Sequence, residues 1–118
     1  MSFSITTETV DDQVAAVAVS GYVDFDAAPA LKHSLVDCIE AGRSQLVVDL
    51  AEAGFIDSTA IGVLAGASRR LAETSGGSLA VVCTDENVLR IFEIAGIETM
   101  LTLYGSRDEA LAAPARAG

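Results

Sequence analysis

The residues of this chain that are best placed for chemistry are three consecutive polar ones, Asp57, Ser58 and Thr59. They follow the strand-forming run Leu46–Val48 and a short loop, and they precede a segment with helical periodicity. We therefore expect the two hydroxyl groups to lie where a helix begins. A helix start offers free backbone N–H groups and a partial positive charge, which suit either a capping oxygen or an added phosphate. Ser58 is thus a candidate modification site. The same sequence would also occur if Ser58 only capped the helix.

The sequence lacks the residues that other kinds of functional site require. Hydrolysis by a nucleophilic serine requires a neighbouring base and an oxyanion hole, but His33 is the only histidine and no G-x-S-x-G turn is present. The glycine patterns of phosphate-binding loops are missing too. Cys38 and Cys83 are far apart and lack C-x-x-C spacing, so we expect two reduced, buried cysteines and not a zinc site. The sequence therefore predicts a protein that is not an enzyme, without metal or cofactor.

Composition and charge restrict the class of protein and its partners. The chain has 118 residues, enough for one domain with a single core, and its 51% hydrophobic content excludes a disordered chain. No apolar run approaches the ~18 residues that span a bilayer, and the N-terminus lacks a secretory signal, so we expect a cytoplasmic protein. The net charge of -10 disfavours nucleic acid and anionic membranes as partners. A protein with a basic surface would be attracted, but the same acidity is equally explained as a means of keeping a small protein soluble.

Hydrophobic periodicity and turn residues divide the chain into alternating strands and helices. The expected strands are Phe3–Thr7, Val14–Ser20, Gln45–Leu50, Ser78–Cys83 and Leu101–Tyr104. The expected helices run from the N-cap Asp26, with Pro29 in the first turn, to Gly42; from Ser58 to about Ser75; from the N-cap Asp85 through Ala95 to the stop at Gly96; and from Asp108 to Ala113. This order predicts an α/β domain: a mostly parallel central sheet of about five strands, an antiparallel N-terminal hairpin, and about four helices packed around the sheet.

The helix expected from Ser58 has two different faces. Bulky apolar residues recur on one face, and the opposite face carries the smooth strip Thr59, Gly62, Val63 and Gly66. Each glycine in an exposed helix costs roughly 1 kcal/mol relative to alanine, so a surface under no other demand would more often carry charged residues. Two explanations are open: another protein lies on the strip, or the glycines admit a neighbouring loop of the same domain.

Residues 46–64, LVVDLAEAGFIDSTAIGVL, resemble the signature of the STAS domain, the sulphate-transporter and anti-sigma-factor-antagonist domain. In that signature a strand ending in Asp-Leu leads through a short loop to Asp-Ser-Ser/Thr-Gly-Leu-Gly-Val-Leu. Further likeness lies in residues 21–24 (GYVD), 76–78 (GGS) and 91–97 (IFEIAGI). The resemblance covers nearly the whole chain, with 1–113 as the STAS domain and 114–118 as a frayed tail. The chain departs from the signature at Ala60, where the family has Gly, and at Ile61, where it has Leu.

The chain is most similar to the free-standing bacterial anti-sigma-factor antagonists, and this resemblance implies a mechanism. Such proteins bind an anti-sigma factor that is also a serine kinase and so free a sigma factor. The kinase phosphorylates the serine after the motif's Asp, here Ser58, and a serine phosphatase restores binding. With the smooth helix strip included, the predicted partner-binding residues are Asp24, Asp57, Ser58, Thr59, Gly62, Val63 and Gly66. The alternative is a STAS accessory or scaffold subunit, for example of a bacterial lipid-transport ATPase; self-association stays open.

Overall fold

The strands and helices follow one another in the order ββαβαβαβα, as the hydrophobic pattern predicts. The structure is a computed structural model, and it describes residues 2–73, 77–96 and 101–112. Within these residues the strands are β1 (Phe3–Thr9), β2 (Val14–Val23), β3 (Gln45–Ile56), β4 (Ser78–Val82) and β5 (Thr102–Tyr104). The helices are α1 (Ala28–Glu40), α2 (Ser58–Ala72), α3 (Glu86–Ala95) and α4 (Arg107–Ala112).

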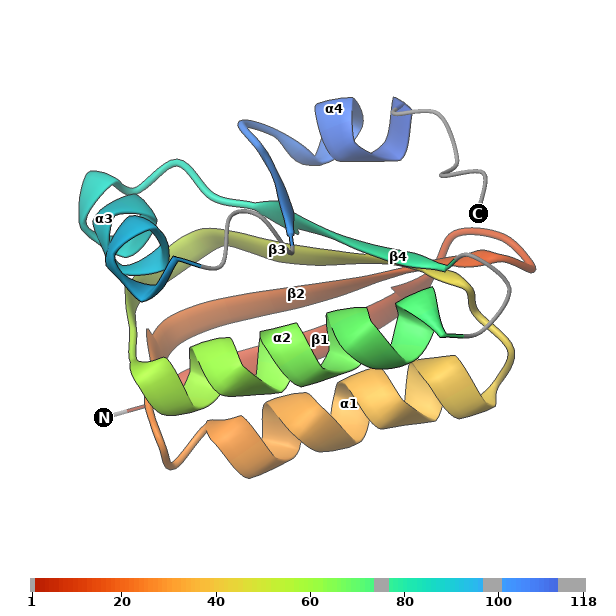
Figure 1. The fold of residues 1–118 in the computed structure, drawn as a ribbon, viewed down its shortest axis with the longest axis horizontal. Coiled ribbons are helices and arrows are strands. Elements are labelled where there is room, and N and C mark those ends of the chain that lie inside the picture. Colours follow the sequence, from red (N-terminus) through yellow and green to blue (C-terminus); the bar gives the residue numbers. More distant parts are fainter. Residues whose placement is uncertain (1, 74–76, 97–100, 113–118) are drawn as a thin grey trace.

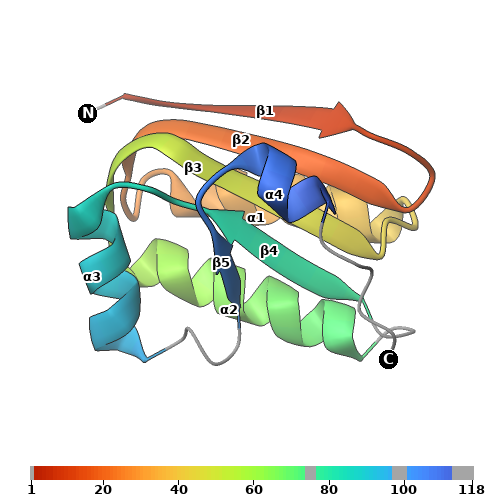
Figure 2. The same ribbon diagram turned by 90° about the horizontal axis from the view of Figure 1, so that it is seen from above.

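The strands form one mixed sheet in the order β1-β2-β3-β4-β5, so neighbours in sequence are also neighbours in space. β1 and β2 pair as an antiparallel hairpin, and β3, β4 and β5 each run parallel to the strand before them. α1 and α2 lie side by side on one face of the sheet, and α4 lies on the other (Figure 1 and Figure 2). This arrangement confirms the predicted α/β class with its antiparallel hairpin.

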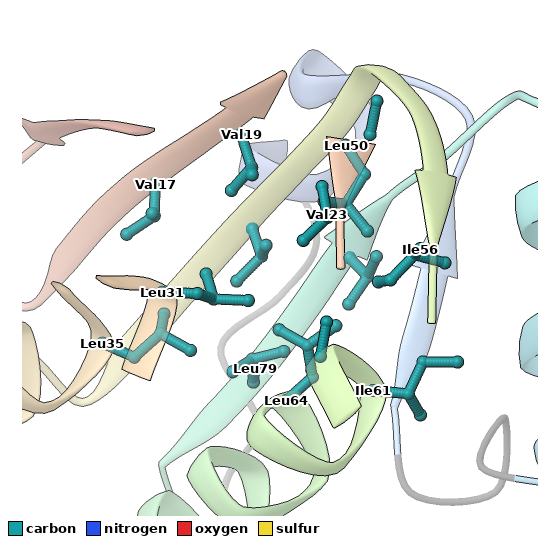
Figure 3. Close-up of a cluster of buried hydrophobic side chains, with 14 of the residues drawn as sticks. Val17, Val19, Val23, Leu31, Leu35, Leu50, Ile56, Ile61, Leu64 and Leu79 are labelled. Carbon is teal, nitrogen blue, oxygen red and sulfur yellow. The ribbon is translucent and has the colours of Figure 1, made fainter. Parts of the chain in front are cut away.

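The main core lies between the sheet and the layer formed by α1 and α2. Figure 3 shows side chains of β2, β3 and β4, such as Val17 and Leu79, turned toward Leu31 of α1 and Leu64 of α2. Alternate strand residues face the other way and form a smaller cluster with α4: Ala16, Val47, Val82 and Ala110. The central part of β3 is therefore buried on both faces, as its continuous apolar run predicts.

Both cysteines are buried in the main core. Cys38 of α1 and Cys83, directly after β4, are free thiols, which confirms the prediction made for them. Loss of water around the sulfur atoms raises the pKa of both thiols above the ordinary value. At neutral pH they therefore stay protonated and pack as small apolar side chains.

β2 and β3 are longer than the sequence predicts. The predicted ends at Ser20 and Leu50 are wrong, because the strands continue to Val23 and Ile56. Their last residues stay paired, with Val23 opposite Ile56, after irregularities of register that include one next to Gly21. The composition of the segment AEAG favours a loop, but pairing with β2 holds this segment in a strand.

The start of α1 differs from the prediction of an N-cap at Asp26. The N-cap is Ala27, and no side chain caps this helix, although Pro29 does lie in the first turn. Asp24 shapes the turn instead. Its carboxylate accepts a hydrogen bond from the Asp26 N–H at 3.0 Å, and its carbonyl accepts from the N–H groups of Ala27 and Ala28 at 3.0 and 3.1 Å. An Asp that bonds to the backbone two residues on forms a turn, and here that turn replaces the predicted cap.

The other boundaries agree with the sequence to within a few residues. Asp85 caps α3 through two backbone N–H groups of its first turn, and the helix ends at Gly96, both as predicted. α2 ends at Ala72, earlier than the predicted Ser75, which lies outside the described residues, as does the segment 113–118. Within the described part of the chain, no helix is both long and apolar enough to cross a membrane.

The glycine near the end of β2 provides a test of the fold. Gly21 has a φ of +86°, and a Cβ there would lie 2.5 Å from the carbonyl oxygen of Ser2. We expect Gly21→Ala to lower the free energy of unfolding by more than about 1 kcal/mol, because alanine is strained at positive φ. Gly54→Ala in β3 is the control, since a Cβ there meets no atom within 4 Å. Urea unfolding followed by circular dichroism measures both variants, and equal losses would contradict the prediction.

Candidate functional site

Asp57 and Ser58 form the start of α2. Asp57 is the N-cap: its backbone is extended, and its carboxylate accepts a hydrogen bond from the Ala60 N–H at 3.0 Å. Ser58 is the first helical residue, and both Ser58 and Thr59 are exposed. Because Asp57 already caps the helix, Ser58 does not have the capping role that the sequence left open. Its hydroxyl is exposed and makes no hydrogen bond within the described residues.

A backbone hydrogen bond ties this helix start to the neighbouring strand. The Asp57 N–H donates to the carbonyl of Val23, the last residue of β2, at 3.2 Å. Ile56 before Asp57 and Ile61 after it are both buried in the main core. Apolar anchors on either side therefore fix the polar segment between them, and the Ser58 hydroxyl has a defined place on the surface.

Asp24 lies at the same corner of the molecule. It directly follows Val23, whose carbonyl is bonded to Asp57, and the side chains of Asp24 and Asp57 are both half-buried. Figure 1 and Figure 2 both show the turn between β2 and α1 beside the first turn of α2. The structure thus brings the carboxylates of Asp24 and Asp57 to the neighbourhood of the Ser58 and Thr59 hydroxyls.

The small residues of α2 form one wall of a groove between α1 and α2, with a volume of about 370 Å³. Gly62 and Gly66 are exposed, and Val63 is half-buried. A Cβ added at either glycine would meet no atom within 4 Å, so no loop in the described part of the domain needs them. The groove is lined by Lys32, Leu35, Val36 and Ile39 of α1 and by Thr59, Gly62, Val63, Gly66, Ala67 and Arg70 of α2.

The α1 wall of this groove is not among the residues predicted from the sequence. Lys32, Val36 and Ile39 follow one another at i, i+4 and i+7, a spacing that places them on one side of a helix and that could have indicated this wall. Lys32 is the only lysine of the chain, and Arg70 on the facing helix forms an ion pair with Glu40 at 3.7 Å. The lining of the groove is therefore mostly apolar, with two cationic side chains.

The two departures from the STAS signature face the core. Ala60 and Ile61 are only 0% and 3% exposed. Both lie in α2, and a helical backbone favours alanine over glycine. A partner lying over Ser58 would therefore not contact either side chain to any appreciable extent.

The described residues do not form a metal site at this corner. No set of three or more His, Cys, Asp or Glu side chains among residues 2–73, 77–96 and 101–112 is arranged to hold a metal ion. His33 is exposed on α1 and pairs with Asp37 at 3.2 Å. The chemistry offered at the corner is a pair of hydroxyls beside carboxylates.

The STAS domain family model matches residues 5–110 of the chain. This chain belongs to the STAS domain family. Among its relatives, the anti-sigma-B factor antagonist of Bacillus subtilis (strain 168) is 31% identical over 92 residues, which are 78% of this chain and 83% of that protein. The anti-sigma-B factor antagonist of Listeria monocytogenes is 30% identical over 109 residues, which are 92% of this chain and 95% of that protein.

Solved structures of STAS relatives have the same fold. The crystal structure of an anti-sigma factor antagonist from Mycobacterium paratuberculosis matches with a TM-score of 0.85 and 28% identity, covering 93% of this chain and 92% of that one. Unphosphorylated SpoIIAA, also an anti-sigma factor antagonist, matches with a TM-score of 0.78 and 16% identity, covering 92% and 93%. The names of these relatives describe antagonists of anti-sigma factors, which agrees with the prediction that this chain is not an enzyme.

The open space at the α2 glycines gives a second stability test. Gly66→Ala should raise the free energy of unfolding by up to about 1 kcal/mol, because alanine favours a helix and the added methyl group meets no neighbour. The reverse exchange at the next position, Ala67→Gly, should lower it by a similar amount. Urea unfolding of both variants gives the values. A Gly66→Ala variant less stable than the wild type would show that the domain itself needs this glycine.

Proposed function

We propose that this STAS protein is a cytoplasmic anti-sigma-factor antagonist that is switched by phosphorylation of Ser58. In its unphosphorylated form it binds an anti-sigma factor that is also a serine kinase, and the anti-sigma factor then releases its sigma factor. The observation that carries the proposal is the exposed Ser58 hydroxyl at the start of α2, where Asp57 is the cap. Relatives of nearly the same length that are named antagonists support it.

The proposed partner-binding surface runs from the Ser58 corner along the exposed side of α2. Its residues are Asp24, Asp57, Ser58, Thr59, Gly62, Val63 and Gly66. Exposed glycines let the backbone of a partner approach α2 closely, which accounts for two residues that weaken the helix. The net charge of -10 and the carboxylates at the corner favour an anti-sigma factor with a basic surface.

Phosphorylation should leave the fold of the free protein nearly unchanged. A phosphate group adds about -1.5 to -2 charges at neutral pH. The helix dipole and free N–H groups at the start of α2 offset part of this charge, by roughly 0.3–1 kcal/mol. Since Ser58 is exposed, water solvates the rest.

Phosphorylation should, in contrast, strongly weaken the complex with the anti-sigma factor. A partner closed over Ser58 would bury the dianion next to Asp57, and disturbing a buried charged contact at an interface costs about 2–5 kcal/mol. That cost corresponds to a roughly 30- to 4,000-fold loss of affinity. Local repulsion is therefore enough for a switch, and no global rearrangement is required. A serine phosphatase that removes the group would restore binding.

Mapping of the phosphorylated residue tests the proposal at its chemical step. The protein is incubated with ATP and the anti-sigma-factor kinases encoded by the same organism, and the products are analysed by mass spectrometry. We expect one phosphate on Ser58, because its hydroxyl is exposed and unbonded, and no product from Ser58→Ala. Thr59→Ala is the matched control and should still be phosphorylated. Phosphate on another residue, or on none with any of these kinases, would count against the proposal.

A charge substitution tests the switch. Ser58→Asp should bind the anti-sigma factor at least about 30-fold more weakly than the wild type, because it places an anion in the interface. Its melting temperature should stay within about 5 °C of the wild type, since an acid in the first turn suits the helix dipole. Ser58→Ala is the matched control and should bind. Affinity by isothermal titration calorimetry and melting by circular dichroism supply the two values.

Co-purification separates this function from that of an accessory subunit. Tagged protein isolated from its own cells should carry a small anti-sigma-factor kinase. Recovery of the subunits of a lipid-transport ATPase, with undiminished recovery from Ser58→Asp, would favour the scaffold alternative.

A further inference from the structure

Phe25 is the most exposed aromatic side chain in the described part of the chain, with 66% of its surface accessible. It lies in the turn between β2 and α1. Tyr22, three residues earlier on β2, is 41% exposed, and its ring stacks on the ring of Phe55 with the centroids 5.5 Å apart. Exposed aromatic side chains are typical of protein-binding surfaces.

Phe25 lies at the same corner as Ser58. It is two residues after Val23, whose carbonyl accepts the hydrogen bond from the Asp57 N–H at 3.2 Å, and Ser58 directly follows Asp57. Both ribbon views show this turn beside the start of α2 (Figure 1 and Figure 2). An interface of ordinary size covers about 800 Å² on each partner, so a protein that sits over Ser58 also reaches Phe25.

The exposure of Phe25 does not come from a loose loop. The turn is fixed by the Asp24 carboxylate, which accepts from the Asp26 N–H, and by the Asp24 carbonyl, which accepts from the N–H groups of Ala27 and Ala28. Ala27 and Ala28 are buried, 0% and 4% exposed. Because the backbone of this turn is already fixed, little conformational entropy is lost when the Phe25 side chain binds a partner, which makes it an efficient anchor.

We propose that Phe25 is the apolar anchor of the surface that binds the anti-sigma-factor kinase; this inference rests on the proposed function. The partner would present an apolar pocket for the Phe25 ring, surrounded by basic side chains. The charges at the corner favour this occupant. Segments 21–31 and 53–63, which meet there, contain the acids Asp24, Asp26 and Asp57 but no Lys or Arg, and Lys32 lines the adjoining groove together with Thr59.

The same charges disfavour a second copy of the chain as the occupant. Two copies joined through this corner would bring like charges together, which costs several kcal/mol at an interface. A partner with basic side chains gains from the same acids, chiefly in its rate of association. The buried ring then contributes to the lifetime of the complex, as aromatic side chains at interface centres usually do.

The experiment measures the affinity of the unphosphorylated protein for the anti-sigma-factor kinase of the same organism by isothermal titration calorimetry. Phe25→Ala should bind about 10- to 100-fold more weakly. Val10→Ala is the matched control: Val10 is 42% exposed and lies in the turn between β1 and β2, at the opposite end of these strands, and should bind as the wild type does. Phe25→Leu, which keeps an apolar group, should bind more tightly than Phe25→Ala.

A second pair of variants tests the basic surroundings of the pocket. Asp26→Lys and Asp12→Lys change the net charge equally, but Asp12 lies in the distant turn between β1 and β2. Association rates from surface plasmon resonance should fall about 10-fold for Asp26→Lys and much less for Asp12→Lys. Equal effects of the two variants would overturn the inference of a basic rim.

The outcomes separate this inference from the proposed function. If the wild type binds, Ser58→Asp does not, and Phe25→Ala binds as the wild type does, the anchor is overturned and the switch stands. If Phe25→Ala changes self-association in analytical ultracentrifugation but not the affinity for the kinase, the occupant is a second copy and the inference fails. A wild type that binds no anti-sigma-factor kinase would overturn both.

Discussion

The hydrogen bond from the Asp57 N–H to the Val23 carbonyl is the interaction on which the arrangement of the site depends. It joins the last residue of β2 to the residue that caps α2, and so it holds two polar turns against each other. Together with the pairing of Val23 and Ile56, it gives Asp24 and Phe25 on one turn a fixed relation to Ser58 on the other. The side chains of Val23 and Ile56 are buried in the main core, and their packing helps to keep the donor and the acceptor of this bond in place. A short polar corner is thus positioned by the core of the domain.

Several surface features at and near this corner are not explained by the stability of the domain. Gly62 and Gly66 weaken α2, although no neighbouring atom lies close enough to require a glycine at either position. The Phe25 side chain is largely exposed to solvent. Such features fit the proposed binding of a partner, and they extend from the corner along one side of α2. The core-facing side of the same helix, with Ala60 and Leu64 fully buried, carries no comparable irregularity. The α1–α2 groove adds a mostly apolar surface next to the strip.

Much of the fold could be predicted from the sequence because periodicity reports burial directly. The alternation of strands and helices, the cap at Asp85 and the buried cysteines all follow from local patterns and agree with the structure. The ends of β2 and β3 could not be predicted, because pairing between distant segments holds residues there that locally favour a loop. The N-cap at Asp26 was wrong for a related reason: Asp24 forms a competing turn with the same backbone groups. The candidate site divides in the same way. The Ser58 motif is local and was found, whereas the α1 wall of the groove and the exposed corner around Phe25 depend on how elements pack.

In the proposed function, one phosphate on Ser58 controls binding without altering the fold. The most direct measurement titrates the anti-sigma-factor kinase with protein fully phosphorylated on Ser58, then with the same preparation after treatment with a serine phosphatase. Phosphorylation should weaken binding at least about 30-fold, and dephosphorylation should restore it fully. Equal affinities for the two forms would contradict the proposed function.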